Sequence, residues 1–493
     1  MRVQGGGNQV SDKNRHIHLI GICGTAMASL AGMLDQRGFR VTGSDRAAYP
    51  PMSDFLRSLA ITVKEPFDRK NLEPRPDLVI IGNAISRGNP ELEHVLNERI
   101  PFCSLPQILH DEFLVGKQVL VVAGTHGKTT TTSMLAWIFE SAGLRPSFLI
   151  GGIAENFQSS FQLREGEHFI LEGDEYDTAF FDKGPKFLHY FPDGLILTSV
   201  EFDHADIYKD LDAVETAFKR LVNLVPARGR IVAFDSGESL ERCLARPFCP
   251  VERYGRRASD WQIRDLDLGK ENTRWSLWKQ GKFWADFEFP LAGEYNVWNA
   301  TAAAALAASC GISPDLIRNA LATFKGVKRR LEVRTVVRGV TIIDDFAHHP
   351  TAIQSTLAAL RSRYPGARLW VILEPRSNTL RRNILQRDLA KSLAAADEVV
   401  VANVFNAEGI PESERLDLPA LQAEIEKHGR RARIVPTVDG IIEAVAPELR
   451  PGAVVAILSN GGFGGIYEKL PRRLERLAAA AAASEVAEAR PRP

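Results

Sequence analysis

Long apolar runs and paired cysteines are both missing from this sequence of 493 residues. No uncharged run of about 18 or more apolar residues occurs, so we expect no transmembrane segment. Residues 1–15 are rich in Gly, Asn, Gln and charge and lack an apolar core, so we expect no signal peptide. The five cysteines form no Cys-x-x-Cys pair, which argues against a disulfide framework or a structural zinc site and is typical of reduced thiols in a cytoplasmic protein.

An excess of one charge is also missing, because 61 Lys and Arg residues balance 61 Asp and Glu residues. A neutral chain has no overall field that attracts a polyanion, so we expect no nucleic-acid partner, and we expect no membrane partner either. The hydrophobic share of 45% and the charged share of 25% are typical of a globular protein. At roughly 100–200 residues per domain, the length predicts about three domains, but nothing indicates an oligomeric state.

Short apolar strands alternate with helical segments along the chain, which predicts an α/β protein with doubly wound parallel sheets. The predicted strands are 16–20, 39–42, 77–81, 118–123, 168–171, 194–198, 341–343, 369–373, 398–402 and 454–458. The predicted helices are 25–37, 129–142 and 297–309, and residues 231–289 are expected to form strands and turns. We divide the chain into a disordered leader (1–15), an N-terminal domain (16–116), a central domain (117–326), a C-terminal domain (327–476) and a tail (477–493).

A phosphate-binding loop is the strongest single signal. The segment Gly124-Thr-His-Gly-Lys-Thr-Thr130 stands between a predicted strand and a predicted helix. Glycines let backbone N–H groups close around phosphate oxygens, Lys128 can reach the β- and γ-phosphates, and the Thr129 hydroxyl can bind Mg²⁺. Val122 stands where the usual pattern has its first glycine, so an ordinary glycine turn is the alternative interpretation.

Acidic residues follow two later strands. The first group is Glu172-Gly-Asp-Glu-Tyr-Asp177, and the second is Glu201-Phe-Asp-His-Ala-Asp206. An acid at the carboxyl end of a neighbouring strand is where a nucleotide-bound metal finds a further ligand. Solvated loops are the alternative for each group alone, but their repeated placement after strands favours a magnesium site.

A glycine turn, Gly21-Ile-Cys-Gly24, follows the first predicted strand and opens a helix. It resembles a dinucleotide-binding turn, but the G-x-G-x-x-G spacing fails at Cys23 and Ala26. Asp45, after the second strand, can accept a hydrogen bond from a ribose hydroxyl. A turn without a ligand and an NAD-dependent oxidoreductase are the alternatives, and the separate phosphate loop makes the second less attractive.

Seven motifs, in this order along nearly the whole chain, resemble the Mur ligase family. They are residues 21–27, 124–130, 172–177, 201–208, 293–300, 328–332 and 344–351. The resemblance implies three domains: an N-terminal Rossmann-like UDP-binding domain, a central ATPase-type domain with a parallel or mixed sheet, and a Rossmann-like C-terminal domain. It also implies an ATP-dependent ligase with Mg²⁺ as cofactor, ATP as co-substrate and an acyl phosphate intermediate.

Two branches of that family resemble the chain, and both act on UDP-N-acetylmuramate. One adds L-alanine, and the other adds the cell-wall tripeptide L-Ala-γ-D-Glu-meso-diaminopimelate. Phe346, Ala347 and the stretch Leu373–Thr379 resemble the tripeptide branch, which implies a role in peptidoglycan synthesis and recycling, and so in cell-wall biogenesis, cell shape and cell division. A nucleotide-sensing protein without catalysis is a further alternative. The joint presence of Lys128, Thr129, Glu172 and His204 argues against it.

The resemblance also implies roles for individual residues. The ATP-binding residues are Gly124, Thr125, His126, Gly127, Lys128, Thr129, Thr130, Asn296, Asn299 and Asp345, and the catalytic residues are Lys128, His126, His348 and Arg330. The metal ligands are Thr129, Glu172 and His204. The UDP-substrate residues are Gly21, Gly24, Thr25, Ala26, Met27, Ser44, Asp45, Asn83 and Ala84.

Two residues have competing interpretations. Arg376 is expected to bind a carboxylate of the incoming peptide, because its planar guanidinium suits that group, and a surface ion pair is the alternative. Lys219 stands near the position at which some Mur ligases carry a carbamylated lysine. We expect it to be an unmodified residue on a helix surface.

Overall fold

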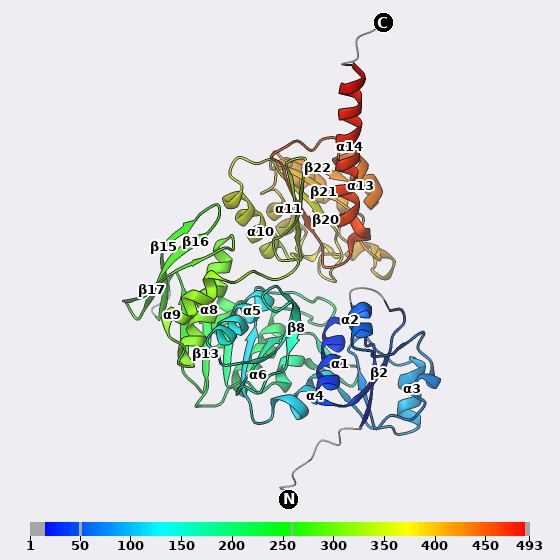
Figure 1. The fold of residues 1–493 in the computed structure, drawn as a ribbon, viewed down its shortest axis with the longest axis vertical. Helices are drawn as coiled ribbons and strands as arrows, with labels where there is room; N and C mark the ends of the chain where they lie inside the picture. The colour runs from blue at the N-terminus through cyan, green and yellow to red at the C-terminus, as the bar shows by residue number, and fades with distance from the viewer. Residues whose placement is uncertain (1–14, 49–51, 258–259, 489–493) are drawn as a thin grey trace, which may run out of the picture. The chain divides into compact units, whose positions relative to one another are not determined.

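The structure, a computed structural model, describes residues 15–48, 52–257 and 260–488 (Figure 1). These residues form two compact units. Unit 1 contains the described residues up to Val200, together with Asp212–Asp260 and Ala302–Ala320. Unit 2 contains Glu201–Leu211, Trp261–Thr301 and the described residues from Leu321 onward. Both units combine helices with sheets, so the predicted α/β class is confirmed.

The N-terminal part of unit 1 is a five-stranded parallel sheet in the order β3-β2-β1-β4-β5. Its strands are β1 (His16–Ile20), β2 (Arg40–Ser44), β3 (Val63–Lys64), β4 (Leu78–Ile81) and β5 (Phe102–Ser104). Its helices are α1 (Thr25–Arg37), α2 (Met52–Ser58), α3 (Pro90–Asn97) and α4 (Leu105–Leu109). The strand order reverses at β1, so the carboxyl ends of β1 and β4 form the switch point at which doubly wound sheets bind ligands.

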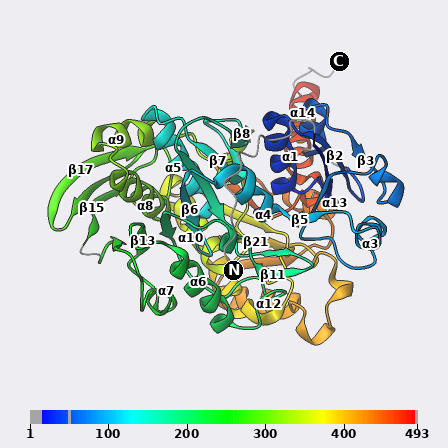
Figure 2. The ribbon, with the colours of Figure 1, turned by 90° about the horizontal axis from the view of Figure 1, so that it is seen from below.

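A second sheet of unit 1 has β6 near its centre, in the order β14-β13-β12-β6-β9-β7-β8. Its strands are β6 (Gln118–Ala123), β7 (Ser147–Ala154), β8 (Ser159–Gln162), β9 (His168–Gly173), β12 (Gly194–Leu197), β13 (Arg230–Phe234) and β14 (Val251–Gly255). Only β8 pairs antiparallel, and the other pairs for which the register is defined in the described chain are parallel. The helix α5 (Lys128–Ser141) lies along β6, β7 and β9 (Figure 2).

Two elements of unit 1 differ from the sequence prediction. Residues 231–289 include a helix, α7 (Glu238–Cys243), where only strands and turns were expected. A helix of six residues is too short to show a helical repeat of apolar residues. A hairpin of β10 (Asp177–Ala179) and β11 (Asp182–Pro185), which was also not predicted, follows the first acidic group. The helix α6 (Leu211–Leu224) has a buried apolar face.

Unit 2 contains three consecutive antiparallel strands, β15 (Trp261–Leu268), β16 (Thr273–Lys279) and β17 (Lys282–Phe289). The aromatic rings of Trp275 and Phe287 stack with centroids 5.3 Å apart, and Phe289 meets Trp275 edge-on at 4.9 Å. These contacts stabilise one face of the strands. The helices α8 (Glu294–Ser309) and α9 (Pro314–Ala322) follow in the chain.

The C-terminal sheet of unit 2 has the order β18-β19-β23-β20-β21-β22, and only the edge strand β18 is antiparallel. The strands are β18 (Glu332–Val337), β19 (Val340–Asp345), β20 (Leu369–Leu373), β21 (Glu398–Val401), β22 (Arg431–Ile434) and β23 (Val454–Leu458). The helices are α10 (Pro350–Arg363), α11 (Gln386–Leu393), α12 (Leu418–Lys427), α13 (Val438–Val445) and α14 (Ile466–Glu488). The last strand, β23, pairs with both β19 and β20, so the loops after these three strands meet at a second switch point.

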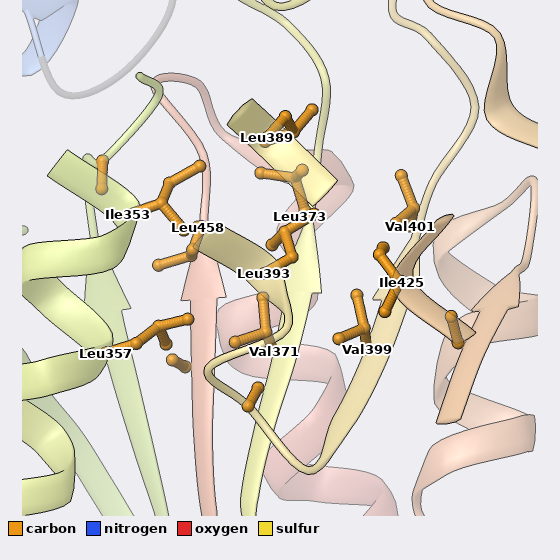
Figure 3. Packing of buried hydrophobic residues seen from close by; sticks show 14 of the residues in the cluster. Ile353, Leu357, Val371, Leu373, Leu389, Leu393, Val399, Val401, Ile425 and Leu458 are labelled. Carbon is orange, nitrogen blue, oxygen red and sulfur yellow. The ribbon is translucent and has the colours of Figure 1, made fainter. Parts of the chain in front are cut away.

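Buried aliphatic side chains hold helices to one face of the C-terminal sheet. Figure 3 shows Ile353 and Leu357 of α10, Leu389 and Leu393 of α11 and Ile425 of α12 packed over residues of β20, β21 and β23. A separate buried cluster, with members from α13 and α14, covers the other face. The strands β19, β20, β21 and β23 therefore present apolar side chains to both faces, as parallel strands covered by helices require.

The two ends of the chain lie partly outside the described residues. The leader was predicted to be disordered, and all of it except Arg15 lies outside the described residues. The helix α14 continues through the alanine-rich part of the tail to Glu488, and residues 489–493 lie outside the description. Alanine has the highest helix propensity, so the alanine run favours this continuation. Within the described part of the chain, no helix has both the length and the apolar character to cross a bilayer.

Candidate active site

The phosphate loop (residues 124–127) connects β6 to the first turn of α5 in unit 1. Gly124 has a φ of +135°, and a Cβ there would collide with the Thr198 side chain. Gly127 has a φ of +80° and directly precedes the first residue of α5. The loop is tied to the segment after β12 by Thr125 N–H, which donates to the Ser199 carbonyl at 2.9 Å, and by His126 N–H, which donates to Ser199 Oγ at 3.1 Å. The loop therefore has the strand–turn–helix context that phosphate binding requires.

Lys128 places a largely buried cation at the start of α5. Its Nζ donates to the carbonyl oxygens of Gly124 at 2.7 Å and Thr125 at 3.3 Å, and it pairs with Glu175 at 2.9 Å. Burial opposes the charge, but Glu175, Glu172 and Asp174 outweigh burial and raise the pKa of Lys128 above its ordinary value. Lys128 is therefore cationic at neutral pH, as neutralisation of a phosphate requires.

Glu172, at the end of β9, faces the second residue of α5. Its Oε1 accepts a hydrogen bond from the Thr129 hydroxyl at 3.0 Å, and its Oε2 accepts one from Gly151 N–H at 2.7 Å. Nearby, Asp174 pairs with Lys186 at 2.7 Å. Burial opposes ionisation, but Lys186 and Lys128 hold the pKa of Asp174 below its ordinary value. Unit 1 therefore brings Lys128, Thr129 and Glu172 together, and Thr130 lies buried one residue further along α5. Glu175 and Ser199 are neighbours that sequence reasoning had not singled out.

The glycine turn (residues 21–24) lies at the switch point of the N-terminal sheet. Gly21 N–H donates to the Ser44 carbonyl at 2.8 Å, and Asp45 accepts from Cys23 N–H at 2.9 Å. Gly24 and Thr25 are exposed, Ala26 is half-buried and Met27 is buried at the start of α1. After β4, Asn83 and Ala84 are exposed in a turn. The predicted UDP-substrate residues thus gather at the ends of β1, β2 and β4.

The Ser44 side chain belongs to a buried polar cluster beneath this turn. Its hydroxyl donates to Glu91, which also accepts from Asn71 Nδ2 at 2.7 Å and lies 3.6 Å from His18 Nε2. Burial opposes the charge on Glu91, but the nearby His18 ring and the hydrogen bonds from Ser44 and Asn71 outweigh burial and hold the pKa of Glu91 below its ordinary value. Glu91 and His18 carry no recognisable motif, so sequence reasoning missed both.

Glu91→Gln should lower the thermal unfolding midpoint at pH 7, because the ionised carboxylate stabilises the fold through these hydrogen bonds. A depressed pKa in the folded state means that this contribution is present above the unfolded pKa of about 4.5 and is lost as the pH falls through the lower folded value. The difference between the two proteins should therefore stay constant from pH 7 to pH 5 and shrink below that. Scans of unfolding against pH, with the exposed Glu98→Gln as control, would contradict this if the gap widened in acid.

Asp345, at the end of β19 in unit 2, is buried and already hydrogen-bonded. Its oxygens accept from Leu331 N–H at 2.7 Å, Ala347 N–H at 2.9 Å and the Thr356 hydroxyl at 3.2 Å. Burial raises the pKa of Asp345, although the charge of Arg330 opposes this shift. The Arg330 guanidinium lies 4.9 Å from the centre of the Phe346 ring.

Asn296 and Asn299 are both buried on one turn of α8. Asn296 Nδ2 donates to the Ala292 carbonyl at 2.8 Å, and Asn299 Nδ2 donates to Asn296 Oδ1 at 3.3 Å. The neighbouring residue Tyr295 is close to Asp345. Burial, together with the negative charge of Asp345, raises the pKa of Tyr295. Unit 2 thus places this turn of α8 close to the end of β19.

Arg329, the neighbour of the predicted Arg330, pins the loop after β23. Its guanidinium donates to the carbonyl oxygens of Ser459 at 2.7 Å and Gly461 at 2.8 Å, and it pairs with Asp344 at 3.2 Å. Sequence reasoning missed Arg329 because its partners in this loop lie 130 and 132 residues away in the sequence.

His204 and His348 lie in unit 2 on either side of a buried carboxylate, Asp203. The Asp203 carboxylate accepts from the Thr379 hydroxyl at 2.6 Å, and one of its oxygens lies 4.0 Å from His204 Nε2 and 3.8 Å from His348 Nε2. Burial opposes ionisation, but both histidines and Thr379 hold the pKa of Asp203 well below its ordinary value. The metal prediction is therefore divided: Thr129 and Glu172 meet in unit 1, while His204 belongs to unit 2.

Arg376 lies in the β20 loop (residues 374–382), at the switch point of the C-terminal sheet. Its guanidinium stands 3.8 Å above the Phe405 ring and 3.6 Å from Glu374, and its side chain is 32% exposed. The guanidinium lies directly against Gly461 of the loop after β23, where a Cβ would force the Arg376 side chain to move. In unit 1, Lys219 lies on α6 with 45% of its side chain exposed and pairs with Glu215, which is the predicted surface position.

Models of one protein family match three consecutive parts of the chain. The Mur ligase family catalytic domain matches residues 16–113, the Mur ligase middle domain matches 122–307, and the Mur ligase glutamate ligase domain matches 329–461. Together they span most of the chain and the two switch points described above.

Three relatives show how specific the match is. The UDP-N-acetylmuramate–L-alanyl-γ-D-glutamyl-meso-2,6-diaminoheptandioate ligase of Escherichia coli K12 is 44% identical, over 94% of this chain and 99% of the relative. A UDP-N-acetylmuramate–L-alanine ligase of Acidithiobacillus ferrooxidans is 33% identical, over 93% and 97%. The crystal structure of a murein peptide ligase from Psychrobacter arcticus superposes with a TM-score of 0.71 at 36% identity, over 94% of this chain and 99% of that chain.

Proposed function

The chain belongs to the Mur ligase family, and from that premise we propose that it joins UDP-N-acetylmuramate to L-Ala-γ-D-Glu-meso-diaminopimelate at the expense of ATP. The single observation that carries the peptide over L-alanine is the 44% identity to the Escherichia coli tripeptide ligase across 94% of the chain. A relative that adds L-alanine has 33% identity over a similar length. ATP is the energy source, and the products are ADP and phosphate.

The reaction has two steps. The lactyl carboxylate of UDP-N-acetylmuramate attacks the γ-phosphate of ATP, so a carboxyl–phosphate bond forms and ADP leaves. The peptide amine then attacks the acyl carbon, so the amide bond forms and phosphate leaves. Lys128 stabilises the negative charge that gathers on the transferring phosphoryl group, and the backbone N–H groups of the phosphate loop orient it. His126 is proposed beside the reacting phosphate.

A magnesium ion fits the residues at the end of β9. The Thr129 hydroxyl and the Glu172 carboxylate lie 3.0 Å apart, and hard oxygen donors of this kind are the ligands that Mg²⁺ prefers. We propose that these two residues and His204 hold the ion, which would supply further positive charge to the phosphates when bound.

The UDP-substrate is assigned to the switch point of the N-terminal sheet. The exposed Gly24, Thr25, Asn83 and Ala84 offer backbone and side-chain contacts there, and the start of α1 can receive an anion. Ser44 contributes through its backbone position, because its hydroxyl is occupied by Glu91. We propose that residues 16–116 form the domain that binds the UDP-substrate, residues 117–326 the domain that binds ATP, and residues 327–476 the domain that binds the peptide.

In unit 2 the proposed roles concern ATP and the incoming peptide. Asn296 and Asn299 are assigned to the adenine and Asp345 to the ribose, while Arg330 and His348 are assigned to the reacting groups. Arg376 is assigned to a peptide carboxylate, and its partly exposed, planar guanidinium supports that role. Through this reaction the protein would contribute to peptidoglycan recycling, and by way of the cell wall to cell shape and division.

Phosphate release with one amine at a time tests the proposal. With UDP-N-acetylmuramate, ATP and Mg²⁺, we expect rapid phosphate release when the tripeptide is added and far slower release with L-alanine. Omission of UDP-N-acetylmuramate is the control for plain ATP hydrolysis. Faster release with L-alanine than with the tripeptide would reverse the assignment to the peptide branch.

A further inference from the structure

Arg381, in the same β20 loop as Arg376, is a cation without an acidic partner. Its guanidinium donates to the Asn406 carbonyl at 3.2 Å and to the Asn378 side chain. Within residues 15–48, 52–257 and 260–488, no carboxylate forms an ion pair with Arg381, and its buried Nε has no hydrogen-bond partner. An unsatisfied buried donor on a charged group costs free energy, so such a group is expected to have a use.

The acids around this loop are paired with the two arginines that neighbour Arg381. Arg382 forms an ion pair with Glu414, and Arg376 forms one with Glu374 at 3.6 Å. Glu374 also accepts a hydrogen bond from the Ser459 hydroxyl at 2.5 Å. Burial together with the charges of Arg382 and Arg376 lowers the pKa of Arg381, while the charge of Asp206 opposes this shift. The loop therefore has more positive charge than its own acids neutralise.

Arg381 and Arg376 also share one supporting loop. Arg376 stacks on the ring of Phe405, and Arg381 donates to the carbonyl of the next residue, Asn406, which has a φ of +46°. The residues after β21 thus hold both guanidinium groups beyond the carboxyl ends of β20 and β21. Ligands of doubly wound sheets bind at such ends.

We propose that Arg381 binds a second carboxylate of the incoming peptide, beside the one assigned to Arg376. This inference rests on the proposed function, because a tripeptide that ends in a diaminopimelate carries several carboxylates and L-alanine carries one. Nη1 and Nη2 of Arg381 each carry a second N–H beyond those that bind Asn406 and Asn378, and two such N–H groups can hold one carboxylate with parallel hydrogen bonds. Arg381 would then select peptides over single amino acids.

Kinetics of Arg381→Gln test this assignment. The KM for the tripeptide should rise by about 10- to 100-fold, since charge-assisted hydrogen bonds of this kind are lost. The KM values for ATP and UDP-N-acetylmuramate should not change. Arg381→Lys keeps the charge, so its KM for the tripeptide should lie between those of the parent and Arg381→Gln. Arg387 is an exposed arginine on α11, and Arg387→Gln should have the same KM as the parent enzyme.

Peptides in which one carboxylate is converted to an amide distinguish two roles of Arg381: direct binding of the peptide, and support of the surrounding structure. With the parent enzyme, each amide should raise the KM. With Arg381→Gln, one of these amides should raise the KM by less than about twofold relative to the unmodified tripeptide. The reason is that the guanidinium that binds this carboxylate in the parent enzyme is already absent. If Arg381→Gln folds poorly, as judged by its unfolding midpoint, the same comparison is made with Arg381→Lys.

An unchanged KM for the tripeptide in Arg381→Gln would overturn the proposal. So would amides that each raise the KM by the same factor in the parent enzyme and in Arg381→Gln. Neither result touches the proposed function, which fails only if the parent enzyme does not use the tripeptide.

Discussion

Lys128→Ala should lose at least about 10³-fold in the rate of phosphate release while keeping its affinity for UDP-N-acetylmuramate. The ammonium group is buried at the head of α5, where the phosphate loop closes, and its charge has no substitute in an alanine. A single preorganised donor at a developing charge is worth about 10²–10³ in rate, and a full charge is worth at least as much. The UDP-substrate residues belong to a different sheet, so their binding should survive.

Folding must be separated from catalysis in that experiment, because Lys128 also neutralises the buried Glu175. The double variant Lys128→Ala with Glu175→Gln removes both charges and should unfold at a temperature closer to the parent than the single variant. Lys183→Ala, which removes an exposed lysine of β11, is the matched control and should keep full activity. A folded Lys128→Ala enzyme within tenfold of the parent rate would contradict the assigned role.

Glu172→Gln should reduce turnover by about 10²-fold or more and raise the Mg²⁺ concentration needed for half-maximal rate. Glutamine keeps the shape and can still accept from Gly151 N–H, but it removes the negative charge that a hard cation requires. The measurement is the initial rate as a function of Mg²⁺ at fixed ATP. Glu165→Gln, on an exposed position before β9, is the control.

Two outcomes of that titration are informative. A variant that recovers its rate at high Mg²⁺ has lost metal affinity, which supports the ligand role. A variant with the parent Mg²⁺ dependence and a normal rate would show that Glu172 only holds Thr129 and Gly151 in place.

The strands that position the site were predictable, because buried parallel strands are short, continuous apolar runs. The predicted strand 118–123 and helix 25–37 agree with the observed bounds of β6 and α1. The phosphate loop was also predictable, because Gly124 and Gly127 have positive φ angles, which favour glycine and are determined by the local turn.

Contacts between distant residues were not predictable. Ser44 was predictable only as a residue after a strand, and its hydroxyl donates to Glu91, 47 residues further along the chain. Arg329 and Arg381 look like any surface arginine in sequence, and only the fold brings the loops after β23 and β21 to them. The hairpin β10–β11 escaped prediction because its strands are three and four residues long.

The central claim is that this chain adds a peptide, and not a single amino acid, to UDP-N-acetylmuramate. A direct competition tests it: the enzyme receives ATP, Mg²⁺, UDP-N-acetylmuramate and equal concentrations of L-alanine and L-Ala-γ-D-Glu-meso-diaminopimelate, and mass spectrometry identifies the product. We predict UDP-N-acetylmuramoyl-tripeptide as the dominant product, with one ADP formed per amide bond. A product that is mainly UDP-N-acetylmuramoyl-L-alanine would contradict the claim.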